Sequence, residues 1–527
     1  MTSVEGEQPS GQERRAAGEA PSADLAALAR GGRINFFGFV LRLAARLPFL
    51  FIAGRMYGPE ALGRFAYAVL IVELAAQLAT LGLKRGLAQQ LATGGDRPHV
   101  CIAWDALLIA FLGSVLGMGL LFAFPQAMFP NSEIHGFEWL LPVAVLALAW
   151  SDVMLAALAY RHDVGATVRA RAIVEPWVIS IAAFAFAFLS KRDGLIIAYA
   201  LSMLGALVAS AIPFLRSYGV PRGWKPDPAG LWRTVRRYLP VAAADTVEWG
   251  SRRIDIAILG LFASPAIVGI YYVAQNVASL PSKLKTSFDP ILGPVIASNI
   301  ARGDRIAVAR QVRQVGFWVI AAQAAVALAL GIPGEGVMGL VGPEFVVGTA
   351  ALGFLLAAEV VAATATTSEA ALIYIARHRN MVLSLAMLLL QAALSVGLIL
   401  GMRSLDWPIM WQATAPAVAL MLALAFAALT KARLAKSLLG APVSGWRWPI
   451  LWATLAAVAV GQLAILLPEW AELAVGIPAI LAAFGAVVWV KGFGPEDREL
   501  FRMRKADIAE LKEAELPSPG TTGEPAS

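Results

Sequence analysis

The 527-residue sequence has little cysteine, histidine or charge, and each shortage excludes a class of protein. Cys101 is the only cysteine, so the chain can form no internal disulfide and no CxxC metal or redox motif. The four histidines fall at expected loops or span ends, and none pairs at the spacing of zinc ligands. No GxxxxGK[ST] phosphate loop is present, which disfavours an ATP-driven pump. We therefore expect no metal and no cofactor, apart from a coupling cation or proton that the sequence does not identify.

Charged residues make up 15% of the chain and hydrophobic residues 58%, with a mean hydropathy of +0.68. Apolar runs of about 20 residues, long enough to cross a bilayer, recur along almost the whole length. A large soluble helical protein would need polar helix faces that these runs lack. The sequence predicts an all-α polytopic membrane protein with about fourteen transmembrane helices, at 34–54, 61–82, 100–124, 137–160, 168–189, 194–215, 238–262, 267–297, 311–332, 347–375, 380–400, 408–430, 447–467 and 472–490.

The net charge of +7 is placed asymmetrically. Residues 1–32 are polar and lack the apolar core of a cleaved signal peptide, which favours a cytosolic tail. With the amino terminus inside, most of the 43 Lys and Arg residues fall in cytosolic segments and few in external loops, as the positive-inside rule requires. We expect a multi-pass protein of the cytoplasmic membrane with both termini in the cytosol, and membrane lipids rather than nucleic acid as partners.

The longest cytosolic connection divides the chain. Residues 216–237 are basic and proline-containing, and they separate the sixth span from the seventh. This linker predicts two six-helix bundles, followed by two extra helices. The expected domains are a disordered tail at 1–32, bundles at 33–215 and 238–430, helices 13 and 14 at 431–490, and a second cytosolic tail at 491–527.

An internal repeat supports two similar bundles. Sliding the sequence by 206 residues aligns "YGPEALGRFAYA", from Tyr57, with "FASPAIVGIYYVA", from Phe262. The matched pairs are Pro59 with Pro265, Gly63 with Gly269, Phe65 with Tyr271 and Ala68 with Ala274. Six spans separate the copies, so both have the same orientation. This pattern is typical of parallel repeats around a central cavity.

Arginines within the spans are the first candidate binding residues. The apolar run "FFGFVLRLAARLPFLFIAG" contains Arg42 and Arg46, which share one helix face. The repeat places Arg252 at the depth of Arg46, and Arg253 is predicted to stack on Trp249. A lipid-facing arginine at mid-span costs about 3 kcal/mol or more. We therefore expect these four arginines to face a polar cavity between the bundles.

Acidic residues form two further stripes. Asp245, Glu248 and Asp255 share a face of the seventh span with Arg252, and Glu248 can pair with Arg252 at i, i+4. Glu359 and Glu369 mark the tenth span. These carboxylates could bind a coupling cation or proton, compete with substrate for the arginines, or neutralise charge between packed helices. Lone acids near span ends are more simply explained by structural pairing.

The basic centre favours an anionic substrate. Arginine suits phosphate because its planar fork makes bidentate hydrogen bonds. The predicted substrate-binding residues are therefore Arg42, Arg46, Arg252 and Arg253, with a diphosphate as the group they would hold. A channel is disfavoured because no filter-like loop repeats in the sequence.

Three motifs resemble one family. "RMYGPEALGRFAYAVLIVELAAQLATLGLKRGLAQQLA" (55–92), "RRYLPVAAADTVEWGSRRIDIAILGLFASPAIVGIYYVAQNVASLP" (236–281) and "GLVGPEFVVGTAALGFLL" (339–356) are similar to the second, seventh to eighth and tenth helix regions of polysaccharide flippases. These flippases belong to the multidrug/oligosaccharidyl-lipid/polysaccharide (MOP) exporter superfamily. The resemblance covers about residues 30–430 and implies two bundles in a V shape around a central cavity.

The resemblance also implies a function. The family moves polyprenyl-diphosphate-linked oligosaccharides from the cytosolic to the outer leaflet, and its partners would include a polysaccharide polymerase and chain-length machinery. Three rivals stay open: a multidrug antiporter of the same superfamily, a membrane glycan polymerase, ligase or glycosyltransferase, and a peptidoglycan-precursor flippase. The enzyme is disfavoured because the longest outer loop, "GIPGEGVMGLVGPEF", is short and lacks histidine. We therefore predict a flippase and not an enzyme.

Overall fold

The computed structural model describes residues 47–93, 97–285, 296–297, 299–494 and 497. The regular elements in this part of the chain are all helices, and it contains no strand. The α-helices are α2 (Gly58–Ala79), α3 (Leu83–Thr93), α4 (His99–Ala123), α5 (Leu140–Tyr160), α6 (Val164–Thr167), α7 (Glu175–Phe186), α8 (Gly194–Tyr218), α9 (Pro228–Ser251), α10 (Ile254–Phe262), α11 (Pro265–Lys285), α13 (Arg305–Gly331), α14 (Gly334–Val341), α15 (Thr349–Ile375), α16 (Arg377–Ser404), α17 (Ile409–Leu439), α18 (Trp448–Ala464), α19 (Glu469–Ala471) and α20 (Ile477–Val487).

Short 3₁₀ and π segments connect or extend these helices. They are η1 (Ala53–Tyr57), η2 (Pro125–Ala127), η3 (Phe137–Trp139), η4 (Val168–Val174), η5 (Pro343–Gly348), η6 (Glu472–Gly476) and η7 (Val488–Gly492). Carboxylates cap several helix starts: Asp227 accepts hydrogen bonds from the backbone amides of Ala229 and Gly230, and Asp304 accepts one from Ala307. Gly440, with φ +73°, ends α17 in the left-handed conformation that glycine adopts without strain.

The helices agree with the spans expected from hydropathy. Each expected span from the second onward overlaps helical structure, with two helices for 238–262, whereas most of the first span lies outside the described residues. Within the described residues, 9 helical stretches are long and apolar enough to cross a membrane, and α18 is a shorter apolar helix. The protein is therefore a multi-pass helical membrane protein. The count of fourteen spans stays a prediction, because the polar or interrupted helices α7, α9, α10 and α11 are not among the 9.

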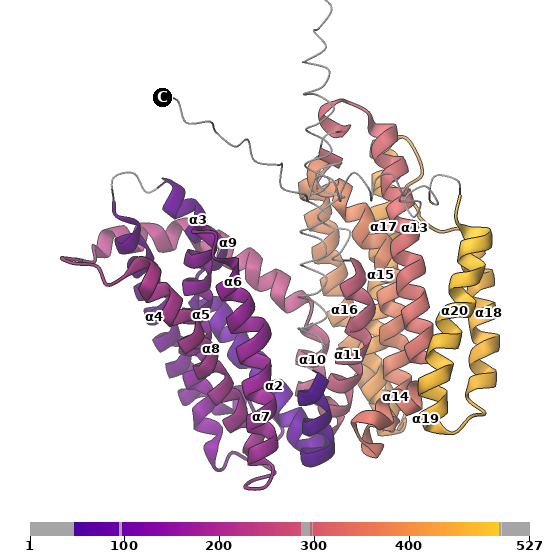
Figure 1. Ribbon diagram of the computed structural model, residues 1–527, viewed down its shortest axis with the longest axis horizontal. Helices are drawn as coiled ribbons and strands as arrows, with labels where there is room; N and C mark the ends of the chain where they lie inside the picture. Colours follow the sequence, from indigo (N-terminus) through magenta and orange to yellow (C-terminus); the bar gives the residue numbers. More distant parts are fainter. Residues whose placement is uncertain (1–46, 94–96, 286–295, 298, 495–496, 498–527) are drawn as a thin grey trace, which may run out of the picture.

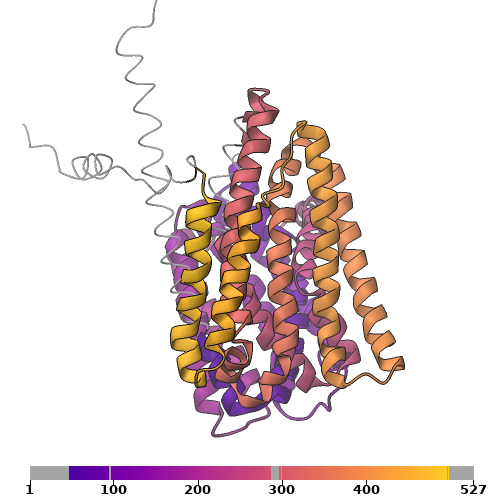
Figure 2. The ribbon, with the colours of Figure 1, turned by 90° about the vertical axis from the view of Figure 1, so that its right-hand side faces the viewer.

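The helices gather into two bundles (Figure 1). In the first, α2, α4, α5, α7 and α8 pack together, and in the second α11, α13, α15, α16 and α17 do so. Helix α9 packs on α2, α3 and α4 of the first bundle, and α10 packs on α16 and α17 of the second. Helices α18 and α20 form a pair that contacts α13, and Figure 2 shows this pair beside the second bundle.

The bundles meet at one end of the molecule and diverge toward the other (Figure 1). We call the end with α14 and α19 the α14 end, and the opposite end the α3 end. At the α14 end, α2 of the first bundle packs along α11 of the second. A continuous buried core joins them, with Leu62 and Phe65 from α2 and Tyr271 and Val273 from α11. This contact is the main structural link between the bundles.

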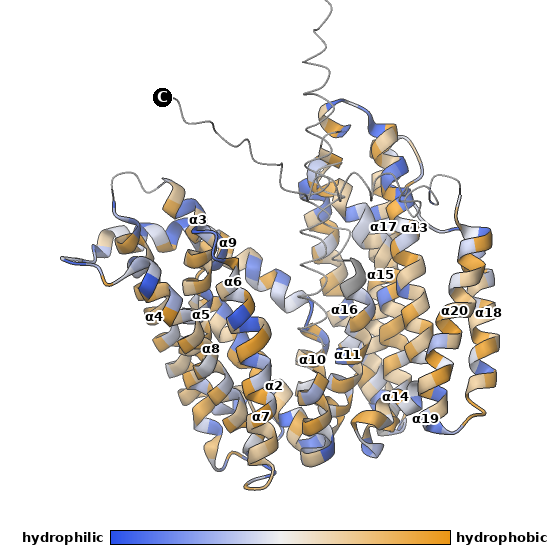
Figure 3. Ribbon diagram, viewed as in Figure 1, coloured by the Kyte–Doolittle hydropathy of each residue, from blue (hydrophilic) through white to orange (hydrophobic). Residues whose placement is uncertain are grey.

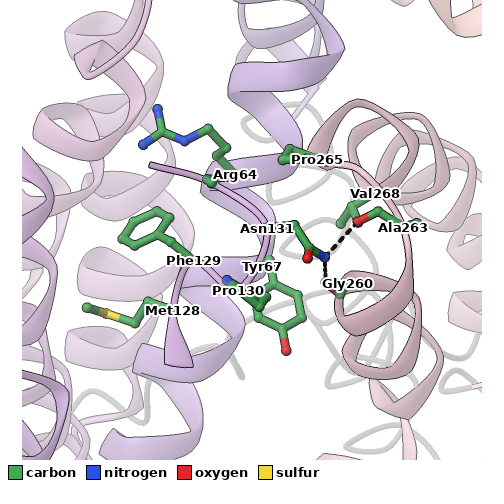
Figure 4. Close-up of a pocket in the computed structure, with 12 residues that line it drawn as sticks. Arg64, Tyr67, Met128, Phe129, Pro130, Asn131, Gly260, Ala263, Pro265 and Val268 are labelled. Carbon is green, nitrogen blue, oxygen red and sulfur yellow. Dashed lines mark hydrogen bonds between the residues drawn. The ribbon is translucent and has the colours of Figure 1, made fainter. Parts of the chain in front are cut away.

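A second link lies beside it, in the loop between α4 and α5. Asn131 donates hydrogen bonds from Nδ2 to the carbonyl oxygens of Gly260 (2.8 Å) and Ala263 (3.0 Å), at the carboxyl end of α10 (Figure 4). Arg64 of α2 holds the same loop by donating to the Glu138 carboxylate at 2.7 Å. The pocket at this junction measures about 20 Å³, room for about one water. It is a packing defect of the junction and is too small for an organic ligand.

The chain after η7 is pinned to the second bundle by Asp497. This carboxylate is 2% exposed and accepts hydrogen bonds from Arg447 (2.8 Å), Trp318 (3.0 Å) and Gln314 (3.2 Å). Burial alone would raise the pKa of Asp497, but the charge and hydrogen bond of Arg447 and the hydrogen bonds from the Gly494 amide and Gln314 outweigh it and hold the pKa below its ordinary value. The carboxylate therefore stabilises the fold when it is ionised.

We expect Asp497→Ala to destabilise the protein by about 2 kcal/mol, because Arg447 loses its carboxylate partner. Since the folded-state pKa is lowered, this contribution is present above the unfolded pKa and is lost as pH falls through the folded pKa. Thermal unfolding in detergent, with Arg447→Ala and the double variant, measures the coupling. Strictly additive losses would contradict the assignment.

Candidate substrate-binding cavity

A cavity of about 430 Å³ opens among helices of the first bundle. Its lining comes from α2, α3, α5, the α6–η4–α7 segment and α9. In Figure 3, hydrophilic stretches near the α6 label and along α9 lie on the side of the first bundle nearer the second. Five of the lining residues are charged: Glu73, Lys84, Asp152, Arg171 and Glu175. Charge is rare in transmembrane segments and marks functional sites, so this cavity is the leading candidate for a binding site.

Arg171 is the centre of the cavity's ion pairs. It lies in the π-helical turn η4, a helix irregularity that is frequent at functional sites. Its guanidinium pairs with Asp152 of α5 and, at 2.8 Å, with Glu175 one turn further along its own segment. The three side chains are only 14–21% exposed. Lys84 of α3 contacts the second oxygen of Asp152 at 3.0 Å. Asp152 therefore pairs with two cations, Lys84 and Arg171.

The expected seventh span, 238–262, is not one continuous helix. Helix α9 ends at Ser251 and α10 begins at Ile254, so Arg252 and Arg253 lie in the turn between them. The preceding Gly250 and Ser251 are weak helix formers, which favours a break at this point. The single helical stripe that was to join Asp245, Glu248, Arg252 and Asp255 is therefore wrong, because the helix is interrupted between Ser251 and Ile254 and Asp255 bonds to α11 instead.

Both local contacts predicted for these arginines are present. Arg252 Nη2 lies 3.4 Å from Glu248 Oε1, and its side chain is 74% exposed. The Arg253 guanidinium lies over the Trp249 ring at 4.7 Å and contacts Glu73 of α2 at 3.0 Å. Arg253 thereby connects the α9–α10 turn to an acid that lines the cavity.

A further cation joins this network from α3. The Arg85 guanidinium lies 2.9 Å from Asp245 Oδ1 and 2.9 Å from Glu248 Oε2, both on α9. Asp245 is buried, whereas Glu248 and Arg85 are exposed. Glu248 therefore bridges Arg85 and Arg252, and the two predicted acids Asp245 and Glu248 do belong to the cavity's surroundings.

The other predicted acids lie in the second bundle. Asp255, 1% exposed, accepts hydrogen bonds of 2.8 Å from Tyr271 and from Gln275 of α11. Glu369 of α15 pairs with the buried Lys431 of α17 at 3.1 Å, and Asn380 of α16 donates to it. Glu359 is partly buried on α15. Asp255 and Glu369 thus bind neighbouring helices together, which is the structural pairing that the sequence left as an alternative. Neither lines the cavity.

The strongest part of the site was missed from the sequence. Lys84, Arg85 and Arg171 lie near span ends, where the charge distribution assigns them to cytosolic segments, and Asp152 and Glu175 resemble lone acids. The i, i+4 spacing of Arg171 and Glu175 was the available signal. Arg42 and Arg46 lie outside the described residues. Among the residues the structure does describe, no three His, Cys, Asp or Glu side chains come together as they would around a metal ion.

Comparison with solved structures identifies the fold. The chain resembles the lipid II flippase MurJ in an inward closed conformation, with 12% identity and a TM-score of 0.66, over 89% of this chain and 100% of that one. It also resembles an inward-facing multidrug resistance MATE family transporter of the MOP superfamily (13% identity, TM-score 0.57, 76% and 98% covered). A MOP superfamily transporter from Pyrococcus furiosus, described as having a binding pocket of reverse polarity, gives 11% identity, a TM-score of 0.53, and coverage of 79% and 95%. The chain therefore has the MOP transporter fold.

The sequence family is narrower than the fold. Residues 35–299, about half of the chain, match the family described as polysaccharide biosynthesis protein. The chain belongs to this family, which confirms the resemblance seen in its motifs. Comparison with curated protein sequences gives no match.

Proposed function

We propose that the protein is a flippase that moves polyprenyl-diphosphate-linked oligosaccharide repeat units across the cytoplasmic membrane for surface or exopolysaccharide synthesis. The family match carries this proposal, because the fold alone is shared by a lipid II flippase and by multidrug transporters. A protein of polysaccharide biosynthesis with a transporter fold acts on a glycan that must cross a membrane. We expect alternating access of the cavity rather than catalysis.

The orientation follows from the charge asymmetry. We place the α3 end, both termini and the basic 216–237 segment in the cytosol, in agreement with the positive-inside rule. The bundles diverge toward this end (Figure 1), so the cavity would be loaded from the leaflet where lipid-linked glycans are made. A polysaccharide polymerase and chain-length machinery would then take up the unit on the other side.

The arginines near the α9–α10 turn are our candidates for the diphosphate. Arg252 is 74% exposed, and its ion pair with Glu248 is long, at 3.4 Å, so a phosphate oxygen could replace that carboxylate. The three acids that line the cavity, Glu73, Asp152 and Glu175, are balanced by the lining cations Lys84 and Arg171 and by Arg253, which contacts Glu73 from the α9–α10 turn. Net attraction for a dianion must therefore come from added positive charge, a role we assign to Arg42 and Arg46. During release of the substrate, Asp245 and Glu248 would compete with the diphosphate for the arginines.

The first test is genetic and chemical. A strain lacking the protein should accumulate polyprenyl-diphosphate-linked glycan and lose surface polymer, and the wild-type gene should restore both. We expect Arg252→Gln to cut surface polymer about tenfold at equal protein level, because one charge-assisted contact to the diphosphate is lost. Arg403→Gln, on an exposed arginine at the end of α16, is the matched control. Unchanged lipid-linked glycans in the deletion strain, with no second flippase present, would refute the proposal.

A multidrug antiporter is the second candidate, and a specific observation favours it. Three acids and Trp249 line the cavity or adjoin it, which is chemistry that suits an organic cation. On this reading, the deletion strain would keep its surface polymer and become more sensitive to lipophilic cations. The same strain therefore separates the two candidates.

A further inference from the structure

The cations of the cavity already have partners. Lys84 and Arg171, the two cations that line it, contact Asp152, and Arg171 also contacts Glu175 at 2.8 Å. To bind a phosphate here, the protein would have to separate Arg171 from carboxylates that are largely shielded from water. Breaking such a pair leaves buried charges without partners, which is costly. The described cavity is thus poorly suited to the diphosphate itself.

Uncharged polar groups in the same cavity are free. Gln77 of α2, Thr167 at the end of α6 and Trp249 of α9 line it. Within the described part of the chain, the Gln77 amide, the Thr167 hydroxyl and the Trp249 indole N–H make no hydrogen bond. We call these three residues the neutral triad. Each member of the triad comes from a different helix.

We infer that this cavity is the glycan subsite, and that it binds the first sugar ring of the substrate while the diphosphate lies outside it, toward Arg252. This inference rests on the proposed function. Sugar hydroxyls both donate and accept hydrogen bonds, so they can satisfy the free amide and hydroxyl and also donate to the cavity's carboxylates without separating them from Arg171. A pocket of about 430 Å³ is within the range that suits small ligands.

Trp249 connects the two parts of the site. One contact of its ring is the Arg253 guanidinium at 4.7 Å, close to the α9–α10 turn, and the residue also lines the cavity. A ligand with a sugar joined to a diphosphate would extend from the cavity past Trp249 to Arg252. The proposed site therefore has two parts: the cavity with the neutral triad, which binds the sugar, and the α9–α10 turn with Arg252, which holds the phosphate.

Three substitutions test the triad: Gln77→Leu, Thr167→Val and Trp249→Phe. The last keeps an aromatic ring for Arg253 and removes the indole N–H together with one of the two fused rings. Full-length protein in detergent is titrated with two probes: undecaprenyl diphosphate, and lipid-linked glycan extracted from the strain lacking this protein. Thr246→Val is the matched control, since the Thr246 hydroxyl donates to the Ala242 carbonyl in its own helix.

We expect the wild type to bind the glycan-bearing lipid about tenfold more tightly than undecaprenyl diphosphate. Each triad substitution should reduce this preference about two- to tenfold, the effect of one neutral hydrogen bond, and leave undecaprenyl diphosphate affinity unchanged. Arg252→Gln should weaken both probes equally, and Thr246→Val neither.

The other outcomes are equally distinct. Equal wild-type affinity for the two probes would overturn the glycan subsite and leave the flippase standing. Equal loss of both probes in the triad variants, or no loss at all, would also overturn the subsite, because the triad would then be structural or irrelevant. Failure of the wild type to bind either probe would refute the proposed function, and the subsite with it.

Discussion

Arg171→Ala is expected to destabilise the protein by about 3 kcal/mol and to abolish export of surface polymer. The alanine leaves Asp152 and Glu175 facing each other across the space of the lost guanidinium, with side chains only 14% and 21% exposed. Lys84 still neutralises Asp152, whereas Glu175 loses the cation that it paired with. Thermal unfolding in detergent and surface-polymer assays in cells measure the two effects.

Two comparisons isolate the cause. Arg169→Ala is the matched control, because Arg169 lies in the same π-helical turn but is 58% exposed and 3.7 Å from Asp163. The triple variant Arg171→Met, Asp152→Asn, Glu175→Gln removes the charges together and should recover most of the stability, because no carboxylate is left unpaired. Export should stay lost if the charges act on the substrate. Wild-type stability of Arg171→Ala, or no recovery in the triple variant, would contradict the ion-pair account.

Much of this fold follows from hydropathy alone. A bilayer imposes about 20 apolar residues on each crossing, and helices such as α4 and α16 satisfy this rule with few charges, so their positions could be predicted closely. The break at Arg252 could not be predicted from periodicity, because a stripe of offsets 0, 3, 7 and 10 presumes an unbroken helix. Tertiary contacts decide otherwise: Arg253 contacts Glu73 on α2, and Asp255 bonds to α11.

The candidate site was only partly predictable for a related reason. Charges in the middle of apolar runs are easy to recognise in a sequence, and on this basis we predicted Arg252, Arg253 and their neighbours Asp245 and Glu248. Arg171 and Lys84 lie at the ends of runs, where charge is normally solvated. Both cations contact Asp152, which lies on another helix. In the sequence, Arg171 is 19 residues from Asp152 and Lys84 is 68 residues from it. No local pattern encodes such a meeting.

The structure shows a contact between the two copies of the internal repeat that the sequence does not reveal. Sliding the chain onto itself pairs Pro59 with Pro265 and Gly63 with Gly269, but it does not say that the paired positions touch. In the structure they do so reciprocally: Gly63 lies against the Pro265 carbonyl, and Gly269 lies against the Pro59 carbonyl. Helices α2 and α11 therefore cross at related points, as two parallel repeats facing each other across a pseudo-two-fold axis would.

We expect Gly63→Ala to separate α2 from α11 and to cost about 3 kcal/mol, at the upper end of ordinary overpacking. A Cβ at Gly63 would lie 1.7 Å from the Pro265 carbonyl oxygen, and one at Gly269 would lie 2.0 Å from that of Pro59. Backbone atoms cannot rotate aside as a side chain can, so the helices themselves must move apart. Glycine is tolerated mid-helix here because it permits this close backbone approach.

Controls within other helices make the test stringent. A Cβ at Gly119 of α4 or Gly353 of α15 meets nothing within 4 Å, so alanine there should be neutral or stabilise by up to about 1 kcal/mol through helix propensity. Thermal unfolding of Gly63→Ala, Gly269→Ala and the double variant then tests whether the crossing is one contact. Once the first alanine has separated the helices, the second meets little resistance, so the double variant should lose much less than the two single losses together. Additive losses would mean that the two glycines act in separate contacts, and wild-type stability of Gly63→Ala would mean that α2 and α11 do not cross this closely.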